Sequence, residues 1–223
     1  MRLSDRILDI LFPPRCAFCG ALTGPEEEGV CPDCRRTLPR YDHARRRIDF
    51  IGEVNAPLNY VGAVRQAVID YKFHDRQGKG RPFGRLIAAD LLSRDGTDCD
   101  IVTWAPLSRR RERKRGYDQA RVLAEAAAEV LKLPAVPLLA KIRDVPAQSG
   151  LTSPEARRAN VSGCYAVIEP ERVKGKRILL IDDVITTGAT VSECARMLML
   201  AGAGRVDAAA LAIRPREKTN SKP

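Results

Sequence analysis

The fold of this chain is decided by the stretch Arg177-Ile178-Leu179-Leu180-Ile181-Asp182-Asp183-Val184-Ile185-Thr186-Thr187-Gly188-Ala189-Thr190. Its first half is continuously apolar, which is typical of a central strand covered on both faces. Two adjacent acids end that strand, a loop of small and hydroxyl residues follows, and residues 192–201 have a helical pattern. Loop amides and the positive end of a helix dipole favour a phosphate, and paired carboxylates accept hydrogen bonds from vicinal hydroxyls or hold Mg²⁺ through water. The sequence therefore predicts a cup for a sugar phosphate.

This run resembles the phosphoribosyl-pyrophosphate (PRPP) loop of type I phosphoribosyltransferases. The resemblance implies that Asp182 and Asp183 are catalytic residues that engage the ribose 2′- and 3′-hydroxyls. It also implies that the following residues bind PRPP and that the loop among them wraps its 5′-phosphate: Val184, Thr186, Thr187, Gly188, Ala189 and Thr190. The alternative is a buried strand that runs into a capped helix, with the acids as turn residues. A generic turn, however, needs neither two acids nor three threonines around a glycine.

Length and composition bound the class of protein. At 223 residues the chain can hold one α/β domain and a small appendage. No apolar run approaches the roughly 20 residues of a membrane span, so we expect no membrane insertion and a cytoplasmic location. Charged residues interrupt segment 3–12, which predicts a short amphipathic helix and not a signal peptide. The net charge of +10, concentrated at 45–47, 109–115 and 214–222, fits nucleic acid or a polyanionic small molecule, and charge alone does not choose between them.

Four of the seven cysteines form two Cys-x-x-Cys pairs separated by eleven residues, namely Cys16, Cys19, Cys31 and Cys34. Each pair can bring two thiolates to one metal, and two pairs complete a tetrahedral structural zinc site with no open position for catalysis. Gly20 suits the tight turn that follows the first pair. A segment of this size lacks a core of its own, so zinc would stabilise it by on the order of 10 kcal/mol. Two disulfides are the competing interpretation, which a cytoplasmic chain disfavours, and a redox dithiol would not explain two pairs.

The body of the chain alternates strand and helix patterns. This alternation predicts an α/β fold with a mainly parallel sheet flanked by helices, and ligands at the carboxyl ends of the strands. Strands are expected at 54–60 (interrupted by Pro57), 100–104, 136–139, 164–168, 178–181 and 206–213, and helices at 62–73, 82–92, 117–131 and 191–200. The expected organisation is a zinc module at 1–40, a linker at 41–52, a phosphoribosyltransferase-like domain at 53–215 and a disordered basic tail at 216–223.

The run 109–115 contains six bases and one acid between a predicted strand and a predicted helix. Phosphoribosyltransferases have a loop for the pyrophosphate at this position, so the resemblance assigns Arg109, Arg111, Arg115 and Gly116 to that loop. Cleavage at C1 of PRPP expels pyrophosphate, and the protein has mainly to neutralise and align this leaving group, a task shared with magnesium. A solvated charged loop is the alternative.

Between the expected strands at 136–139 and 164–168 lies a segment rich in amide and guanidinium donors. Its members include Arg143, Gln148, Arg157 and Asn160. Such a composition fits a flexible hood that closes over the site and excludes water.

Taken together, these motifs resemble the ComF family of bacterial phosphoribosyltransferase-like proteins, which is linked to natural competence. The shared features are Phe12-Pro13-Pro14, the four cysteines, Ala105-Pro106-Leu107, Arg115-Gly116-Tyr117-Asp118-Gln119, the spaced set Gln148, Leu151, Arg157, Asn160 and Val161, and the run 181–190. Asp118 departs from the common pattern and adds a negative charge beside the proposed pyrophosphate loop. Lys72 matches a lysine that the family often has, although a helix-surface lysine is the simpler interpretation. His43 lies in no motif and is expected at the surface.

The resemblance implies a protein that binds PRPP with magnesium, carries a phosphoribosyltransferase site for an unknown acceptor, and serves DNA uptake or natural transformation. Its expected partners are PRPP, single-stranded DNA and proteins of the competence machinery, and it allows an oligomer because related enzymes are often dimers. The alternative is a non-catalytic nucleic-acid-binding accessory protein that keeps the PRPP site as a ligand sensor. An amidotransferase is disfavoured, because that enzyme needs an N-terminal cysteine nucleophile and this chain opens Met1-Arg2-Leu3.

Overall fold

The computed structural model describes residues 13–44, 46–73, 77–94, 96–144 and 162–215. Its central sheet is parallel and has the order β1 (Val54–Asn55), β7 (Arg205–Ile213), β6 (Arg177–Ile185), β3 (Ile101–Trp104). A further short strand, β2 (Leu58–Asn59), also pairs with β7 in parallel. The predicted break at Pro57 therefore divides one edge strand into two pieces, because proline cannot donate to the ladder.

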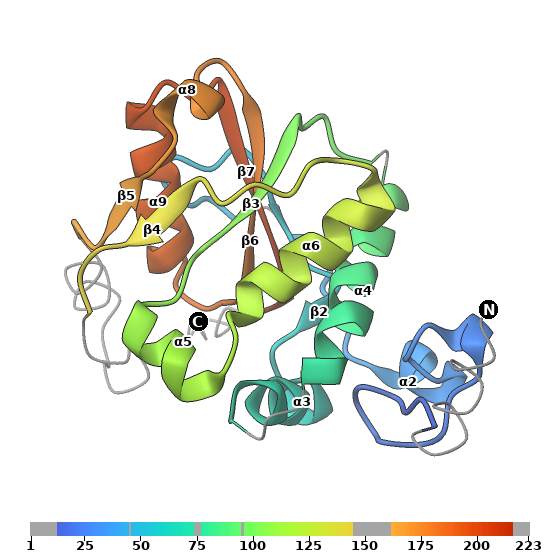
Figure 1. Cartoon of the computed structure of the whole chain (residues 1–223). Coiled ribbons are helices and arrows are strands. Elements are labelled where there is room, and N and C mark those ends of the chain that lie inside the picture. Colours follow the sequence, from blue (N-terminus) through green and yellow to red (C-terminus); the bar gives the residue numbers. More distant parts are fainter. Residues whose placement is uncertain (1–12, 45, 74–76, 95, 145–161, 216–223) are drawn as a thin grey trace, which may run out of the picture.

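Helices cover both faces of the sheet (Figure 1), and alternate residues of β6 belong to two separate apolar clusters. Leu179 and Ile181 pack under α3 (Gly62–Phe73), α4 (Gly80–Leu92) and α6 (Gln119–Leu131). Ile178 and Leu180 pack against α9 (Ala189–Leu200), α8 (Pro170–Val173) and the antiparallel pair β4 (Leu139–Lys141) and β5 (Tyr165–Val167). Each of these fully buried Leu and Ile side chains contributes about 1.5–3 kcal/mol to folding, so the continuous apolar run of β6 predicted from sequence is the centre of the core.

Three elements differ from the sequence-based expectation. Strand β6 continues past the two acids to Ile185, because Val184 and Ile185 still pair with β7. The expected strand at 136–139 begins as a single bridge between Val102 and Ala135 and then becomes β4. The basic run expected to be a loop is the helix α5 (Arg109–Arg115), which begins after the N-cap Ser108 and ends at Gly116 with φ 79°. Arginine, lysine and glutamate are good helix formers, and these two caps define the helix ends.

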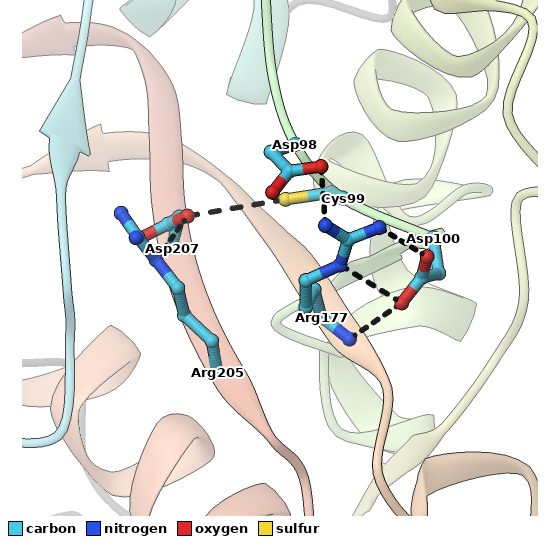
Figure 2. A network of polar contacts seen from close by, with 6 residues as sticks. All are labelled: Asp98, Cys99, Asp100, Arg177, Arg205 and Asp207. Atoms are coloured by element: carbon cyan, nitrogen blue, oxygen red, sulfur yellow. Dashed lines mark hydrogen bonds and ion pairs between the residues drawn. The ribbon is translucent and has the colours of Figure 1, made fainter.

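Ion pairs fix the amino ends of the strands, at the edge of the sheet opposite the two acids of β6 (Figure 2). The Arg177 guanidinium bonds to Asp100 at 2.9 Å and pairs with Asp98, and this contact lowers the pKa of Asp100 to about 2. On the next strand Arg205 pairs with Asp207 at 2.9 Å, and the Asp207 carboxylate also accepts a hydrogen bond from the Cys99 thiol at 3.9 Å. These contacts join the starts of β3, β6 and β7 and support their register.

The N-terminal part packs against the face of the sheet that α3, α4 and α6 cover. It contains a 3₁₀ turn, η1 (Pro25–Glu27), and a short helix, α2 (Pro32–Thr37), and lies beside α3 and α4 in Figure 1. The rings of Phe18 and Phe83 are 5.2 Å apart, so the core of this module is continuous with that of α4. A second 3₁₀ turn, η2 (Gln77–Lys79), precedes α4. The predicted helix at 3–12 and tail at 216–223 lie outside the described residues.

The described residues of segment 41–52 lie along the sheet edge. The Tyr41 amide donates to Pro57 O at 3.2 Å and the Gly52 amide to Val206 O at 2.9 Å. Between these points Arg46 donates to the carbonyls of Thr186 and Arg214. The domain boundaries predicted from sequence remain predictions, but this segment is attached to the sheet by hydrogen bonds. Among the helices that the structure describes, none is long and apolar enough to cross a membrane.

Candidate functional site

Strands β3 and β6 bring polar residues to one edge of the sheet. The acids Asp182 and Asp183 lie near the carboxyl end of β6, and residues 186–188 lead from that strand into α9. Helix α5 follows β3 at the same edge, and α3 ends there with Lys72 and Phe73 (Figure 1). Parallel strands place their carboxyl ends together, so residues that are more than a hundred positions apart in the chain meet here.

The two adjacent acids have different surroundings. One Asp182 oxygen accepts the Asp183 amide at 2.8 Å, and this side chain lines a small hollow formed with residues 184–191. Burial, and next the charge of Asp183, raise the pKa of Asp182 to about 8. The Asp182 carboxyl is therefore largely protonated at neutral pH and can donate as well as accept a hydrogen bond.

Asp183 is held by a lysine from another element. The Lys72 ammonium lies 2.7 Å from its carboxylate, and the two side chains are only 22% and 15% exposed. The expectation of a helix-surface lysine is thus wrong, because the last turn of α3 directs Lys72 into the site. Nothing in the local pattern around Lys72 indicates a partner 111 positions away.

The loop that joins β6 to α9 is tightly packed. Gly188 has φ 86°, and a Cβ built there would lie 2.6 Å from the Ile48 side chain. The Ala189 amide donates to the Thr187 hydroxyl at 3.4 Å. The hollow that Asp182 shares with this loop has a volume of about 10 Å³, about the space of one water molecule. As it stands, the loop has the amides and hydroxyls of an anion site but does not enclose the volume of a phosphate.

The residues assigned to the pyrophosphate loop, which lie in α5 or at its end, differ in their exposure to solvent. Arg111 and Arg115 are half-buried, whereas Arg109 and Gly116 are exposed. The Arg115 guanidinium donates to Gln119 Oε1 at 2.8 Å and lies 5.0 Å from the centre of the Phe73 ring. Burial lowers the pKa of Arg115, and the nearby Asp183 opposes that effect. The structure therefore brings Arg115 toward the acids, and Arg109 points to solvent.

Asp118 has a local structural role. It is buried, accepts the Leu107 amide at 2.9 Å, and caps α6 through the Arg121 amide at 3.3 Å. Burial raises its pKa to about 6. The departure from the family pattern at this position thus supplies an N-cap that ties the end of β3 to α6.

Of the residues assigned to the hood, only Arg143 is described, and its side chain is exposed beside Gly163. Gln148, Arg157 and Asn160 lie outside the described residues. The segment from 145 to 161 is flanked by residues next to β4 and β5, which pair with each other against the α9 side of the sheet.

The four cysteines converge as predicted. The ligand atoms of Cys16, Cys19, Cys31 and Cys34 all lie within 4.8 Å of one another. Cys19 Sγ and Cys31 Sγ are 3.7 Å apart, and thiolates about 2.3 Å from a tetrahedral zinc would be separated by about 3.8 Å. Gly20 has φ 78° and closes the first turn by donating to Cys16 O at 2.9 Å. The donor set therefore fits structural zinc.

Comparisons with known proteins agree with this geometry. The family described as double zinc ribbon domain matches residues 7–45, and the phosphoribosyl transferase domain family matches residues 118–222. Competence protein F of Haemophilus influenzae is 25% identical over 205 residues, covering 89% of this chain and 84% of that protein. The DNA utilization protein YhgH of Escherichia coli is 26% identical over 195 residues, covering 86% and 80%. Competence protein ComFC of Bacillus subtilis is 36% identical over 102 residues, covering 46% and 39%.

Solved structures include two that resemble the fold in part. A glutamine PRPP amidotransferase from B. subtilis is 26% identical with a TM-score of 0.40, and the match covers 58% of this chain but 25% of that one. A hypothetical protein from Neisseria gonorrhoeae with bound ppGpp is 15% identical with a TM-score of 0.39, covering 66% and 73%.

The parallel sheet, the phosphoribosyl transferase domain and the four-cysteine module define a phosphoribosyltransferase-like protein with an N-terminal zinc ribbon. Competence protein F and YhgH are each matched over most of their length, and together with the two domain matches this similarity supports the assignment of the chain to the ComF family.

Proposed function

We propose that this protein binds PRPP together with magnesium at the carboxyl end of β6 and takes part in the use of DNA during natural transformation. In this proposal Asp182 and Asp183 receive the ribose hydroxyls, and the loop at 186–190 receives the 5′-phosphate. Phosphoribosyl transfer to an acceptor of unknown identity is the activity that such a site would support. The role in DNA use follows the names of the curated relatives, which are a competence protein and a DNA utilization protein.

The observation that carries the proposal is the meeting of three features at one sheet edge. A pair of acids, a threonine- and glycine-containing loop at the start of α9, and the half-buried cation Arg115 come from separate parts of the chain. The acids suit vicinal hydroxyls, the loop suits a phosphate, and the guanidinium suits an anionic leaving group. Magnesium, when bound with PRPP, would add positive charge beside the pyrophosphate.

The site must rearrange in two places when PRPP binds. The Lys72 ammonium is paired with the Asp183 carboxylate, and the hollow beside Asp182 has a volume of only about 10 Å³. We therefore infer that the ligand displaces the ammonium from Asp183, which leaves Lys72 beside the anionic pyrophosphate, and that the loop opens from its contact with Ile48. The energy needed for this rearrangement lowers the affinity for PRPP and makes binding depend on the loop.

Calorimetric titration with PRPP and Mg²⁺ tests the site. The wild-type chain should bind, and the double variant Asp182→Asn with Asp183→Asn should lose about tenfold or more in affinity, because the charge of Asp183 is removed and both carboxyl groups become amides. The matched control is Glu171→Gln, which removes one negative charge from an exposed position, since Asp182 is already largely protonated at neutral pH. Equal affinity of all three proteins would refute the assignment of the acids to the sugar.

A second candidate is a nucleic-acid-binding accessory protein in which the PRPP site acts as a sensor. The specific observation in its favour is the exposed face of α5, where Arg109, Arg113 and Lys114 point to solvent beside the candidate site. Several exposed bases on one short helix suit the phosphates of a nucleic acid.

A further inference from the structure

A second hollow has two lining residues, Arg46 and Ile48, that contact the loop of the candidate site. It has a volume of about 920 Å³ and is lined by His43, by residues 46–49, by the sheet edge around β1, and by Arg94 and Arg205. Small-molecule sites commonly measure about 300–1,000 Å³, so this hollow can hold a ligand of nucleotide size. It shares no lining residue with the small hollow beside Asp182.

The lining of this hollow is cationic. Four arginines, Arg46, Arg47, Arg94 and Arg205, face two acids, Asp49 and Glu53. Arg205 is paired with Glu53 at 3.2 Å and with Asp207 at 2.9 Å, which compensates its charge. Arg94 donates to the neutral Asn55 amide oxygen at 3.3 Å and also lies near the Asp90 carboxylate, which compensates part of its charge, and Arg47 is exposed. Guanidinium groups that keep their charge in a concave site favour a phosphate, which they can bind in a bidentate manner.

The hollow also has apolar surface, and His43 is among its lining residues. Ile48, Ile51 and Val54 are partly buried along its wall and offer a surface for a ring. His43, expected at the surface, is instead partly buried and lies 3.5 Å from Asp90. Its Nδ1 atom is buried, so this atom is not presented to a ligand in the hollow. A ligand that combines a phosphate with an apolar ring would use the arginines and the apolar wall.

The wall of this hollow touches the loop of the candidate site. Arg46 donates to the carbonyl of Thr186, and Ile48 packs against Gly188. Both residues also line the larger hollow. An anion that draws the Arg46 guanidinium toward itself weakens its hold on Thr186, so a ligand in the hollow and a ligand in the loop are physically connected through these two side chains.

We propose that the hollow bounded by Arg46, Arg47, Arg94 and His43 is an effector site for a nucleoside monophosphate, and that its occupation changes the affinity of the neighbouring loop for PRPP. The coupling rests on the proposed function, whereas the nucleotide site does not. Linkage requires the effect to be reciprocal: if the nucleotide weakens PRPP binding by a factor, PRPP weakens nucleotide binding by the same factor. A typical coupling of this kind is about fivefold or more.

The site is tested by calorimetry with the four common ribonucleoside monophosphates, with adenosine and with inorganic phosphate. At least one monophosphate should bind, and should bind more tightly than adenosine or phosphate alone. Arg47→Ala with Arg94→Ala should lower this affinity by about tenfold or more, because two charged contacts are lost. The control Arg65→Ala with Arg172→Ala removes equal charge elsewhere. Arg47→Glu, at an exposed position, repeats the test without loss of a packed side chain.

The outcomes separate the two proposals. The monophosphate should still bind to Asp182→Asn with Asp183→Asn, and PRPP should still bind to Arg47→Ala with Arg94→Ala. Failure of all four monophosphates to bind, equal binding of phosphate alone, or loss of binding in the Asp double variant would overturn the effector site. PRPP affinity measured with and without the bound monophosphate should differ by about fivefold, and Arg46→Gln should remove the difference. An unchanged PRPP affinity would overturn the coupling, and absence of PRPP binding would overturn only the proposed function.

Discussion

Asp182 and Asp183 are neighbours in sequence but have opposite electrostatic situations. Asp183 has a lysine at 2.7 Å, and Asp182 is partly buried beside that pair with a pKa raised to about 8. A carboxyl that is protonated in the folded chain and ionised in the unfolded chain makes stability depend on pH. At the scale of single residues, the site is therefore tuned by burial and not only by residue type.

This difference leads to a prediction about pH. An unfolded aspartate has a pKa of about 3.9, so between about pH 4 and pH 8 the folded chain binds more protons at Asp182 than the unfolded chain does. The free energy of unfolding should therefore fall as pH rises through this window, by about 1–5 kcal/mol from this group. Urea unfolding of the wild-type chain and Asp182→Asn, with zinc present throughout, measures the effect.

The comparison with Asp182→Asn isolates this group, because Asp118 also has a raised pKa and contributes a slope of the same sign in both proteins. The wild-type chain should lose stability relative to the variant with each step toward pH 8. Parallel curves for the two proteins would contradict the protonation of Asp182.

At the scale of elements, the sequence pattern was sufficient to predict a helix or strand where apolar side chains of that element are buried. The helix predicted at 62–73 has the bounds of α3, and the apolar run of β6 is the central strand. The loop predicted at 109–115 was wrong, because α5 has no buried residue and its helix depends on the caps Ser108 and Gly116. The contact of Lys72 with Asp183 could not be predicted, since it arises only when α3 packs on the sheet.

Helix α5 carries a prediction about nucleic acid. Its exposed bases Arg109, Arg113 and Lys114 each release a counterion if they contact phosphates of a single strand. Replacing all three with glutamine should reduce the slope of log affinity against log salt concentration by about 2, at about 0.7 per contact. Titration of an oligothymidylate by fluorescence anisotropy at several salt concentrations measures the slope.

The control for this measurement replaces three exposed arginines on other elements, Arg65, Arg81 and Arg172, and lowers the net charge equally. Only the α5 variant should change the slope. The same slope in the wild-type chain and both variants would remove α5 from any nucleic-acid interface.

At the scale of the whole molecule, the zinc module and the sheet share one core but depend on different sources of stability. Cys16, Cys31 and Cys34 belong to the same apolar cluster as Phe83 and Leu179. The sheet has two apolar faces of its own, whereas the described residues of the module, from 13 onward, have little regular structure beyond α2 and η1. Metal binding thus stabilises the module, and Phe18 against Phe83 transmits part of that stability to α4.

Removal of zinc should therefore unfold the module and leave the sheet intact. Structural zinc in small domains contributes about 10–16 kcal/mol, more than a module of this size can replace with its own core. After chelation, a thiol reagent should modify the four ligand cysteines, while Cys99, Cys164 and Cys194 stay protected in the body. Hydrogen exchange should show faster exchange of the amides at 16–38 and near Phe83, and unchanged exchange rates for the amides of β6 and β7.

The chain with Cys99→Ser should give the same number of reactive thiols, since that cysteine is not a ligand. Equal thiol reactivity before and after chelation would show that zinc does not hold the module, and faster exchange throughout β6 would show that the sheet cannot stand without it.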